Sequence, residues 1–461
     1  MNDHNGSQQP SGSSPHGEMN MAPKVTRPQV AAVTILSVLA LAAGVGLAAQ
    51  FGDLSMSARD MQAQGGQNMA GMNMDGNAAS GAMSGMARGG GSPSGSAGNQ
   101  SMPGMNMGTS TSSPTPTPVS QLPDTPLQTP TKMGNLVMPP GMIMTKGMPM
   151  EAMQDMAAVD LSQVRYTAPA AARGDQPLAP QVVNGVKVFN FETSVIRWNI
   201  LPNVQVAAYA VNRQVPGPRL ELTQGDRVRI NVKNNLPEST TIHWHGLIVP
   251  NGMDGAADVT QKPIAPGETF TYEFTVHQAG TYFYHSHKNP DRQQGLGLYG
   301  ALLVKPRNAA NEPKADLDYT LQLQEWLQRD GYTFPAMIME GALPNFFTIN
   351  GKAYPATDTI RMKVGQTVKL RFIGSNNNFV HPMHVHGGPF EVVARDGETL
   401  KESARFLADT VNVGPGQRYD VIWTAREKGT WLVHCHIPHH ITNDNVEVEG
   451  GGGLTMLIQV S

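Results

Sequence analysis

The chain has 461 residues, a formal net charge of −3 and a single cysteine beside 14 histidines. Its length alone allows about three domains. A charge this close to neutrality gives no reason to expect a nucleic-acid partner. One cysteine excludes an internal disulfide framework, and it therefore carries no information about the redox compartment.

The N-terminal part begins with a polar leader, residues 1–29, followed by an uncharged apolar run over residues 30–51. That run is long enough for a bilayer span of about 20 residues. Lys24 and Arg27 precede it, which favours a cytoplasmic N-terminus. Because the leader is long for a cleaved signal peptide, we favour an uncleaved anchor over cleavage near residues 48–50. Either way we expect the rest of the chain to be exported to the periplasmic or extracellular face, and the favoured uncleaved segment would anchor it to the membrane.

Residues 52–180 are expected to form a disordered, Met-rich linker, because the stretch up to residue 145 is rich in Gly, Ser, Pro and Met. Such a composition buries too little apolar surface to offset the entropy of ordering. Eighteen methionines lie within residues 52–156. Thioethers are soft ligands that favour Cu(I), so the segment is predicted to bind Cu(I). The alternative is a spacer whose Met content is compositional bias.

The remaining residues show the alternating pattern of β-strands, for example at 226–233 and 367–372. About 280 residues of this kind fit two β-sandwich domains, predicted over residues 181–310 and 311–461. The proline-containing polar run at 306–316 marks the boundary between them. The fold class predicted is therefore all-β.

The chemistry of the sequence is concentrated in four short histidine clusters, two in each predicted domain. Histidines repeated at this density are not explained by isolated core or surface residues. Imidazole together with one thiolate is the ligand set that suits copper. The clusters are His243-Trp244-His245-Gly246, His285-Ser286-His287, His381-Pro382-Met383-His384-Val385-His386, and His434-Cys435-His436 followed by His440.

Spacing indicates how each cluster is used. Residues i and i+2 of a strand point to the same face, so each His-x-His pair can direct both rings into one cavity. Cys435 must then point away from His434 and His436. It is therefore assigned to a different copper, completed by His381 and His440, and the backbone of residues 434–436 joins the two sites.

The four clusters resemble the motifs HxHG, HxH, HxxHxH and HCHxxxH of the multicopper oxidases, and they occur in the same order. The segments at 265–274, 280–287 and 414–421 are also similar to that family, so the resemblance covers roughly residues 185–461. It implies two cupredoxin-like Greek-key β-sandwiches and four coppers per catalytic unit. It also implies the ligands: type 1 copper at His381, Cys435 and His440; type 2 copper at His243 and His384; and the type 3 pair at His245, His285, His287, His386, His434 and His436.

Two departures concern the surroundings of type 1 copper. The family usually places Met or Leu about five residues after the last type 1 histidine, where this chain has Asn445. We interpret residues 441–452 as an insertion that delays the axial position to Leu454, with Met456 as the competitor. An apolar axial residue raises the reduction potential. Where many relatives have an acid the chain has Ile441, and acids of the insertion could replace it.

Asp254 matches the acid that relatives place near type 2 copper, where it is expected to relay protons to reduced oxygen. Its simpler interpretation is a turn residue before Gly255. His277 and His439 have no assigned ligand role.

The resemblance is to two-domain laccases, in which the trinuclear cluster lies between the first domain of one subunit and the second domain of the next. It therefore implies a homotrimer, and cyclic closure is the ordinary way in which such a contact ends. The function expected is one-electron oxidation of a phenol or a metal ion such as Cu(I) at an exposed imidazole edge of His381 or His440, coupled to reduction of O₂ to water. The alternatives are a non-catalytic copper-storage protein and a two-domain copper nitrite reductase.

Overall fold

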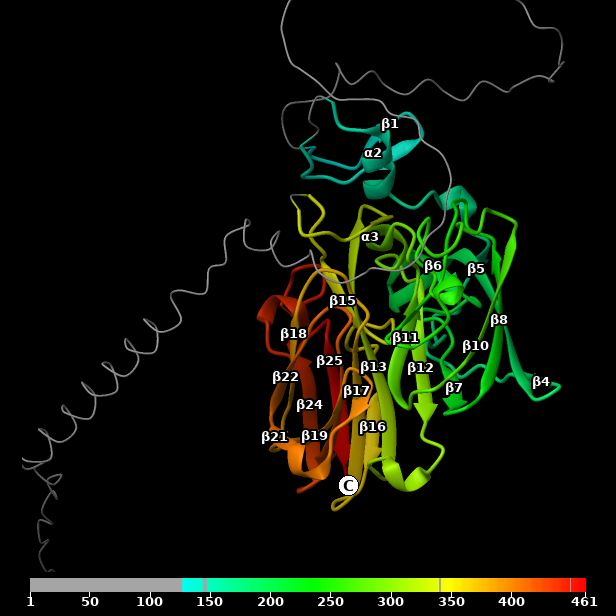
Figure 1. Ribbon diagram of the computed structural model, residues 1–461. Helices are drawn as coiled ribbons and strands as arrows, with labels where there is room; N and C mark the ends of the chain where they lie inside the picture. The colour runs from blue at the N-terminus through cyan, green and yellow to red at the C-terminus, as the bar shows by residue number, and fades with distance from the viewer. Residues whose placement is uncertain (1–126, 144–146, 340, 448) are drawn as a thin grey trace, which may run out of the picture. The chain divides into compact units, whose positions relative to one another are not determined.

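A computed structural model of the chain describes residues 127–143, 147–339, 341–447 and 449–461. The predicted leader, the apolar run and the larger part of the Met-rich linker lie outside these residues, and so do the expectations attached to them. Within the described ranges, no helix is both long and apolar enough to cross a membrane. These residues are mainly β-strands arranged as two sandwiches, as the sequence predicts (Figure 1).

The first sandwich consists of two sheets that enclose one hydrophobic core. Alternation produces it: in β8 (Arg227–Asn234), Val228, Ile230 and Val232 face inward while the polar residues between them face outward. One sheet pairs β8 with β3 (Tyr166–Thr167), β4 (Gln181–Val183), β5 (Val186–Leu201), β6 (Val204–Val211) and β10 (Thr269–Thr275); the other pairs β7 (Leu220–Thr223), β9 (His243–His245), β11 (Gly280–His285) and β12 (Tyr299–Lys305).

The second sandwich begins at Leu317, twelve positions after β12 ends at Lys305, and has its own core. One sheet contains β13 (Leu317–Arg329), β14 (Tyr332–Phe334), β15 (Phe346–Ile349), β17 (Thr367–Gly374), β19 (Phe390–Arg395), β20 (Glu398–Thr399), β21 (Phe406–Ala408) and β23 (Arg418–Thr424). The other contains β16 (Thr359–Met362), β18 (His381–Val385), β22 (Thr410–Val413), β24 (Gly429–Cys435) and β25 (Thr455–Val460).

The two sandwiches share a buried contact. Trp198 and Tyr299 of the first pack with Trp326 and Phe346 of the second in one cluster. The indole Nε1 of Trp198 donates a hydrogen bond to the carbonyl of Gly351 at 2.7 Å. Burial of side chains of this size contributes roughly 1.5–3 kcal/mol each, so the cluster fixes the two sandwiches of one chain against each other.

A buried network of hydrogen bonds joins β11 to the second sandwich. Asp420, which is buried, accepts hydrogen bonds from Thr281 at 2.8 Å and from Arg371 at 2.9 Å. Burial raises the pKa of Asp420, and Arg371 opposes that rise. A buried carboxylate requires such partners because an unpaired charge is costly to remove from water.

The expected disorder up to residue 180 is wrong for the described part of that stretch. Residues 127–143 and 147–180 contain β1 (Thr131–Met133), β2 (Leu136–Met138), α2 (Met150–Met156) and the 3₁₀ turn η2 (Leu161–Gln163). We call this segment up to Ala157 the methionine module. Its core is made of methionines from the Met-rich stretch, packed with two other apolar residues: Met133, Met138, Met142, Met153 and Met156, with Leu127 and Ala157.

The methionine module is attached to the first sandwich through α3 (Pro290–Gln293). Arg292 donates to the carbonyl of Ala157 at 2.7 Å, and Asn289 donates to Asp155 at 3.1 Å. Composition failed to predict the module because flexible methionine side chains can fill an irregular core in place of branched or aromatic residues. Four further 3₁₀ turns complete the described elements: η3 (Asn251–Met253), η4 (Ala309–Asn311), η5 (Glu402–Ala404) and η6 (Pro438–Ile441).

Candidate metal centres

The first candidate centre lies wholly inside the second sandwich. His381 begins β18, Cys435 ends the neighbouring β24, and His440 lies in η6 directly after it. The Nδ1 atoms of His381 and His440 are 3.0 Å apart, and the Sγ atom of Cys435 lies 3.9 Å and 3.5 Å from them. Two imidazole nitrogens and one thiol that converge in this way are the donor set of a blue-copper site.

The alternation of β24 separates this trio from the neighbouring histidines. Cys435 is buried among core residues, whereas His434 makes ring contacts with His384 and His386. The structure thus places Cys435 on one side of the strand and His434 with His436 on the other, the arrangement that the spacing predicts.

Leu454 lies next to the trio. The amide of Cys435 donates to the carbonyl of Leu454 at 3.0 Å, and the amide of Leu454 donates to the carbonyl of His440 at 3.0 Å. Met456 lies two residue pairs further along and is opposite Val433. The backbone therefore holds Leu454, rather than Met456, beside Cys435. In the inserted loop, Asp444 bonds Arg329 at 2.7 Å and Asn345 at 2.6 Å.

One expectation about this centre is wrong. The sequence analysis predicted an imidazole edge of His381 or His440 in contact with solvent, but their exposed fractions are 0% and 2%. Phe347 stacks on the ring of His440 with centroids 4.4 Å apart. His439 is exposed and lies 5.7 Å from the Phe347 ring, so it is the histidine that reaches the surface here.

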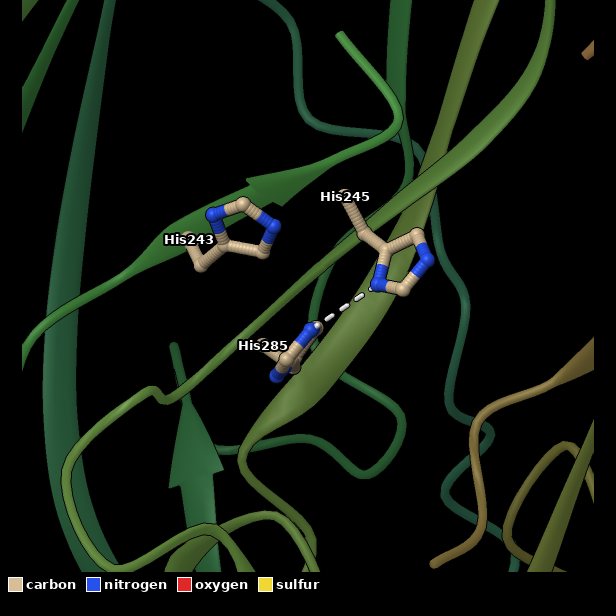
Figure 2. Close-up of side chains that lie close together, drawn as sticks. All are labelled: His243, His245 and His285. Atoms are coloured by element: carbon tan, nitrogen blue, oxygen red, sulfur yellow. Dashed lines mark hydrogen bonds between the residues drawn. The ribbon is translucent and has the colours of Figure 1, made fainter. Parts of the chain in front are cut away.

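The first sandwich carries one set of four histidines, at the adjacent ends of β9 and β11. His243, His245 and His285 bring ligand nitrogens within 4.8 Å of one another (Figure 2). The Nδ1 atom of His245 is 3.2 Å from Nε2 of His285, the contact dashed in Figure 2. His287 joins the set through ring contacts with His243 and His285.

The second sandwich carries the matching set on β18 and β24. The Nε2 atoms of His386 and His434 are 2.9 Å apart, and His436 contacts the rings of His384 and His434. His384 and His386 also line an open pocket with Leu407.

The imidazole rings of the two residues predicted to bind type 2 copper are oriented by the same kind of backbone contact. His243 Nδ1 lies 2.7 Å from the carbonyl of Asp254, and His384 Nδ1 lies 2.8 Å from the carbonyl of Asp409. In each ring a backbone acceptor occupies Nδ1 and leaves Nε2 for a metal, the usual way in which a ligand histidine is oriented.

The two sets do not meet within one chain. Within residues 127–143, 147–339, 341–447 and 449–461, no ring contact joins a histidine of one set to a histidine of the other. His287 and His436, one from each set, are exposed. The structure thus presents two half-sites.

Burial prepares the buried histidines for ligation. It lowers the pKa of His245 to about 3, with Arg418 as the second cause, and it lowers the pKa of His440 to about 3. These rings are neutral at ordinary pH, and neutral imidazole is the form that binds metal. Burial instead raises the pKa of the Cys435 thiol to about 12, so metal binding must displace its proton.

The position of Asp254 is compatible with both a proton-relay role and a turn role. Its Oδ1 lies 3.5 Å from Nδ1 of His243, and its carboxylate is partly exposed. It also ends η3 directly before Gly255, whose positive φ of 88° is typical of a turn.

Two neighbours of the histidines were missed by sequence reasoning. Phe283 stacks on His245 at 4.6 Å and on His285 at 5.1 Å between ring centroids. Glu325 is a buried carboxylate whose Oε1 lies 3.4 Å from Nε2 of His381. The only sequence signal for Glu325 was an acid in the middle of a strand with apolar neighbours.

Comparison with known proteins agrees with this donor set. Two profiles described as multicopper oxidase match residues 192–309 and 324–446, one for each sandwich. The chain belongs to the multicopper oxidase family, whose cofactor is copper. The converging nitrogens and thiol of the described residues fit that metal.

The blue copper oxidase of Nitrosomonas europaea is a similar solved structure, with 33% identity and a TM-score of 0.53, covering 59% of this chain and 85% of that chain. Oxidoreductase ptaE of Pestalotiopsis fici is 32% identical over 264 residues, which are 51% of this chain and 41% of that protein. Laccase-1 of Cryptococcus neoformans is 32% identical over 249 residues, 48% of this chain and 39% of that protein. The chain thus spans about two fifths of the length of the curated relatives it matches.

Proposed function

We propose that the protein is a laccase-like multicopper oxidase that couples one-electron oxidation of a small reductant to reduction of O₂ to water. The observation that carries this proposal is that β24 holds both Cys435 of the buried His₂Cys trio and His434 of one half-site, while β9 and β11 hold a matching half-site. Bound copper would supply one-electron redox chemistry at the trio and oxygen binding at the joined half-sites.

The chain's own residues have definite tasks in this proposal. His381, Cys435 and His440 would hold type 1 copper, and Leu454 is the apolar residue beside them. Cys435 is joined by one peptide bond each to His434 and His436, so the shortest covalent route for electrons between the centres runs along β24. Type 2 copper is assigned to His243 and His384, and the remaining six histidines of the half-sites are assigned to the type 3 pair.

Asp254 is proposed to hold or deliver a proton near His243. Its carboxylate is close enough to the ring to accept a hydrogen bond through small movement, and its partial exposure connects it to solvent. If Asp254 acts only as a turn residue, Asp254→Asn should retain oxygen reduction; loss of activity with full copper content supports the proton role.

We propose that the half-sites are completed between subunits of a homotrimer. The exposed Leu407 lines the pocket of His384 and His386. Ile248 and Val259 are exposed beside the first half-site, and the loop that carries Val259 is tied to Lys288, the neighbour of His287, by an ion pair from Asp258 of 3.2 Å. Exposed apolar side chains around both half-sites fit surfaces that are covered by another subunit. Light scattering after size exclusion tests this: a fully active monomer would contradict it.

For the reductant we propose a phenol or a metal ion, Cu(I) in particular. The methionine module supports Cu(I), because it gathers soft thioethers in one cluster. Met337 packs against that cluster, and its neighbour Ala336 accepts a hydrogen bond from Asn378, which in turn bonds Glu325 beside His381. A continuous chain of contacts thus leads from the module to the type 1 trio.

The same methionine cluster favours the second candidate function, non-catalytic copper storage. Oxygen consumption with a phenolic dye and with Cu(I), at saturating copper, separates the two. Reduction of oxygen supports the oxidase; copper uptake without oxygen consumption supports storage; and reduction of nitrite in place of oxygen would support the third alternative, a nitrite reductase. Calorimetric titration of a Cu(I) donor into the metal-free protein should show several sites beyond the copper centres, and their absence would leave the Met-rich segment as a spacer.

We further propose that the enzyme is exported and held at the membrane by residues 30–51. The support is the uncharged run in the sequence and the basic residues before it. Protease digestion of intact cells and of membrane fractions tests this proposal. The oxidase should be accessible from outside and remain with the membrane after a salt wash.

A further inference from the structure

Glu325 lies at the centre of a closed polar cluster behind the type 1 trio. Its exposed fraction is 1%, and three donors bind its carboxylate. Oε1 accepts from the side chain of Asn376 at 2.8 Å and from the amide of Phe379 at 2.9 Å, and Oε2 accepts from Asn378 at 2.6 Å. All three partners donate, so both oxygens of the carboxylate act as acceptors.

No lysine or arginine neutralises this buried charge among the ion pairs of the described ranges; its partner there is His381. Oε1 lies 3.4 Å from Nε2 of His381, a buried nitrogen that makes no hydrogen bond in the described part of the chain and has this carboxylate as its nearby acceptor. The opposite ring nitrogen, Nδ1, faces Cys435 and His440. The His381 ring thus has one side directed at the metal donors and the other at a carboxylate.

We propose that Glu325 is a positioning residue for the type 1 centre and sets its reduction potential. It holds the proton of His381 on Nε2, which leaves the lone pair of Nδ1 for copper. Its negative charge makes the imidazole a stronger donor and stabilises the higher oxidation state, as carboxylates hydrogen-bonded to ligand histidines do. This inference rests on the proposed oxidase function.

Glu325 therefore opposes Leu454. An apolar axial neighbour raises the potential of a blue-copper site, and a carboxylate behind a ligand ring lowers it. Glu325 belongs to β13, whereas the donors of the trio belong to β18, β24 and η6. The potential of the centre is thus adjusted from a strand that contributes no copper ligand.

The test is a redox titration of the blue absorption in purified, copper-loaded full-length protein. Glu325→Gln should shift the potential upward with the blue band retained, and Glu325→Asp should move it back toward the wild-type value. Glu312→Gln is the matched control, because it makes the same charge change in an acid that bonds Lys369 and Arg371 and no predicted ligand. The control should leave the potential unchanged.

A readout on metal-free protein makes the test independent of turnover. Nitrogen-15 spectra of the histidine side chains should show His381 protonated at Nε2 in the wild type and a mixture of tautomers in Glu325→Gln. If Glu325→Gln does not fold, Asn378→Ala is used instead. It removes one donor from the carboxylate, strengthens the interaction with His381, and should shift the potential downward.

An unchanged potential in a folded, blue Glu325→Gln protein, or an unchanged or raised potential in Asn378→Ala, would overturn the proposal. Glu325 would then only support the loop of residues 376–379. A wild-type protein without any blue band would instead overturn the proposed function itself, so the two failures are distinguishable.

Discussion

The type 1 trio and the two half-sites are both built from histidines. Within one chain, however, only the trio brings all of its predicted ligands together. The trio is closed within one sandwich, with donor atoms 3.0 to 3.9 Å apart and every member buried. The half-sites lie on different sandwiches, and each retains an exposed histidine. In the proposed function, folding of one chain therefore completes the electron-accepting centre, whereas the proposed oxygen-binding centre is completed by a second surface.

The two regions also differ in what sets their geometry. The trio depends on a short loop, since His440 lies in the 3₁₀ turn η6 that follows Cys435, and His381 comes from the adjacent strand. Each half-site depends on strand alternation at two neighbouring strand ends, and in the proposed trimer its closure depends on how another subunit docks. Substitutions in the trio should therefore change that centre alone. Substitutions near the half-sites should change oxygen reduction through their effect on the association of subunits.

The largest effect is expected at the trio. Cys435→Ser removes the single thiolate of the chain, so it should abolish the intense blue absorption and the oxidase activity. The half-sites contain no sulfur ligand and should keep most of their copper, which metal analysis and electron paramagnetic resonance would measure. A variant that kept its blue band would show that Cys435 does not bind type 1 copper.

The second largest effect is expected at the half-sites, where a substitution should remove oxygen reduction and leave the blue absorption of the trio. Leu407→Glu places a charge on the exposed apolar rim of the second half-site and should dissociate the trimer. Oxygen reduction should fall in proportion to dissociation while the blue band persists, because the trio lies inside one sandwich. Oxygen consumption and light scattering on the same samples measure both quantities.

The control for that variant is Val364→Glu, which alters an exposed apolar residue that lines neither half-site. It should leave assembly and activity unchanged. A monomeric Leu407→Glu protein with full oxygen reduction would mean that one chain closes the cluster.

The pH dependence of copper affinity should differ between the type 1 trio and the half-sites. Burial raises the pKa of the Cys435 thiol to about 12, so the metal-free protein holds that proton and must release it on binding. Affinity of the trio for Cu(I) should therefore rise about tenfold per pH unit between roughly pH 6 and 9. His440 adds no slope, because burial lowers its pKa to about 3 and its ring is already neutral.

The same titration in Cys435→Ser is the control, since that variant has no thiol proton to release. His245, whose pKa is also lowered to about 3, gives the half-sites no slope of its own. Competition with a Cu(I) chelator at each pH measures the affinity. A flat profile in the wild type would mean that the thiol is already ionised before copper arrives.

Sequence reasoning was most effective where the chemistry is local. Alternation around Cys435 predicted that His434 and His436 point away from the thiol, and the alternating pattern predicted the strands that became β8 and β17. It was weaker where remote residues meet. Glu325 reaches His381 from a strand 56 positions earlier in the chain, and no local pattern encodes that approach.

The methionine module and the burial of the trio were missed for related reasons. Composition treats Met in a Gly-rich stretch as unstructured, although Met133, Met138 and Met156 pack into one core. Phe347 of β15 stacks on His440 and helps to bury it. The motif HCHxxxH contains no information about that contact. Both errors arise from tertiary packing, which spacing along the chain does not report.

The smallest predicted effect concerns the route by which electrons reach the buried trio. His439 is exposed, and its ring lies 5.7 Å from Phe347, which stacks on His440 at 4.4 Å. A reductant that docks on His439 is thus one aromatic ring away from a copper ligand. His439→Ala should lower kcat/KM for the reductant about tenfold, equivalent to ~1.4 kcal/mol of transition-state stabilisation, with the blue band and the potential unchanged. His277→Ala, which removes an exposed histidine of the first sandwich, should have no effect. Equal kcat/KM values in all three proteins would place the docking site elsewhere, whereas a loss of blue colour in His439→Ala would show that this residue supports the centre itself rather than the contact with the reductant.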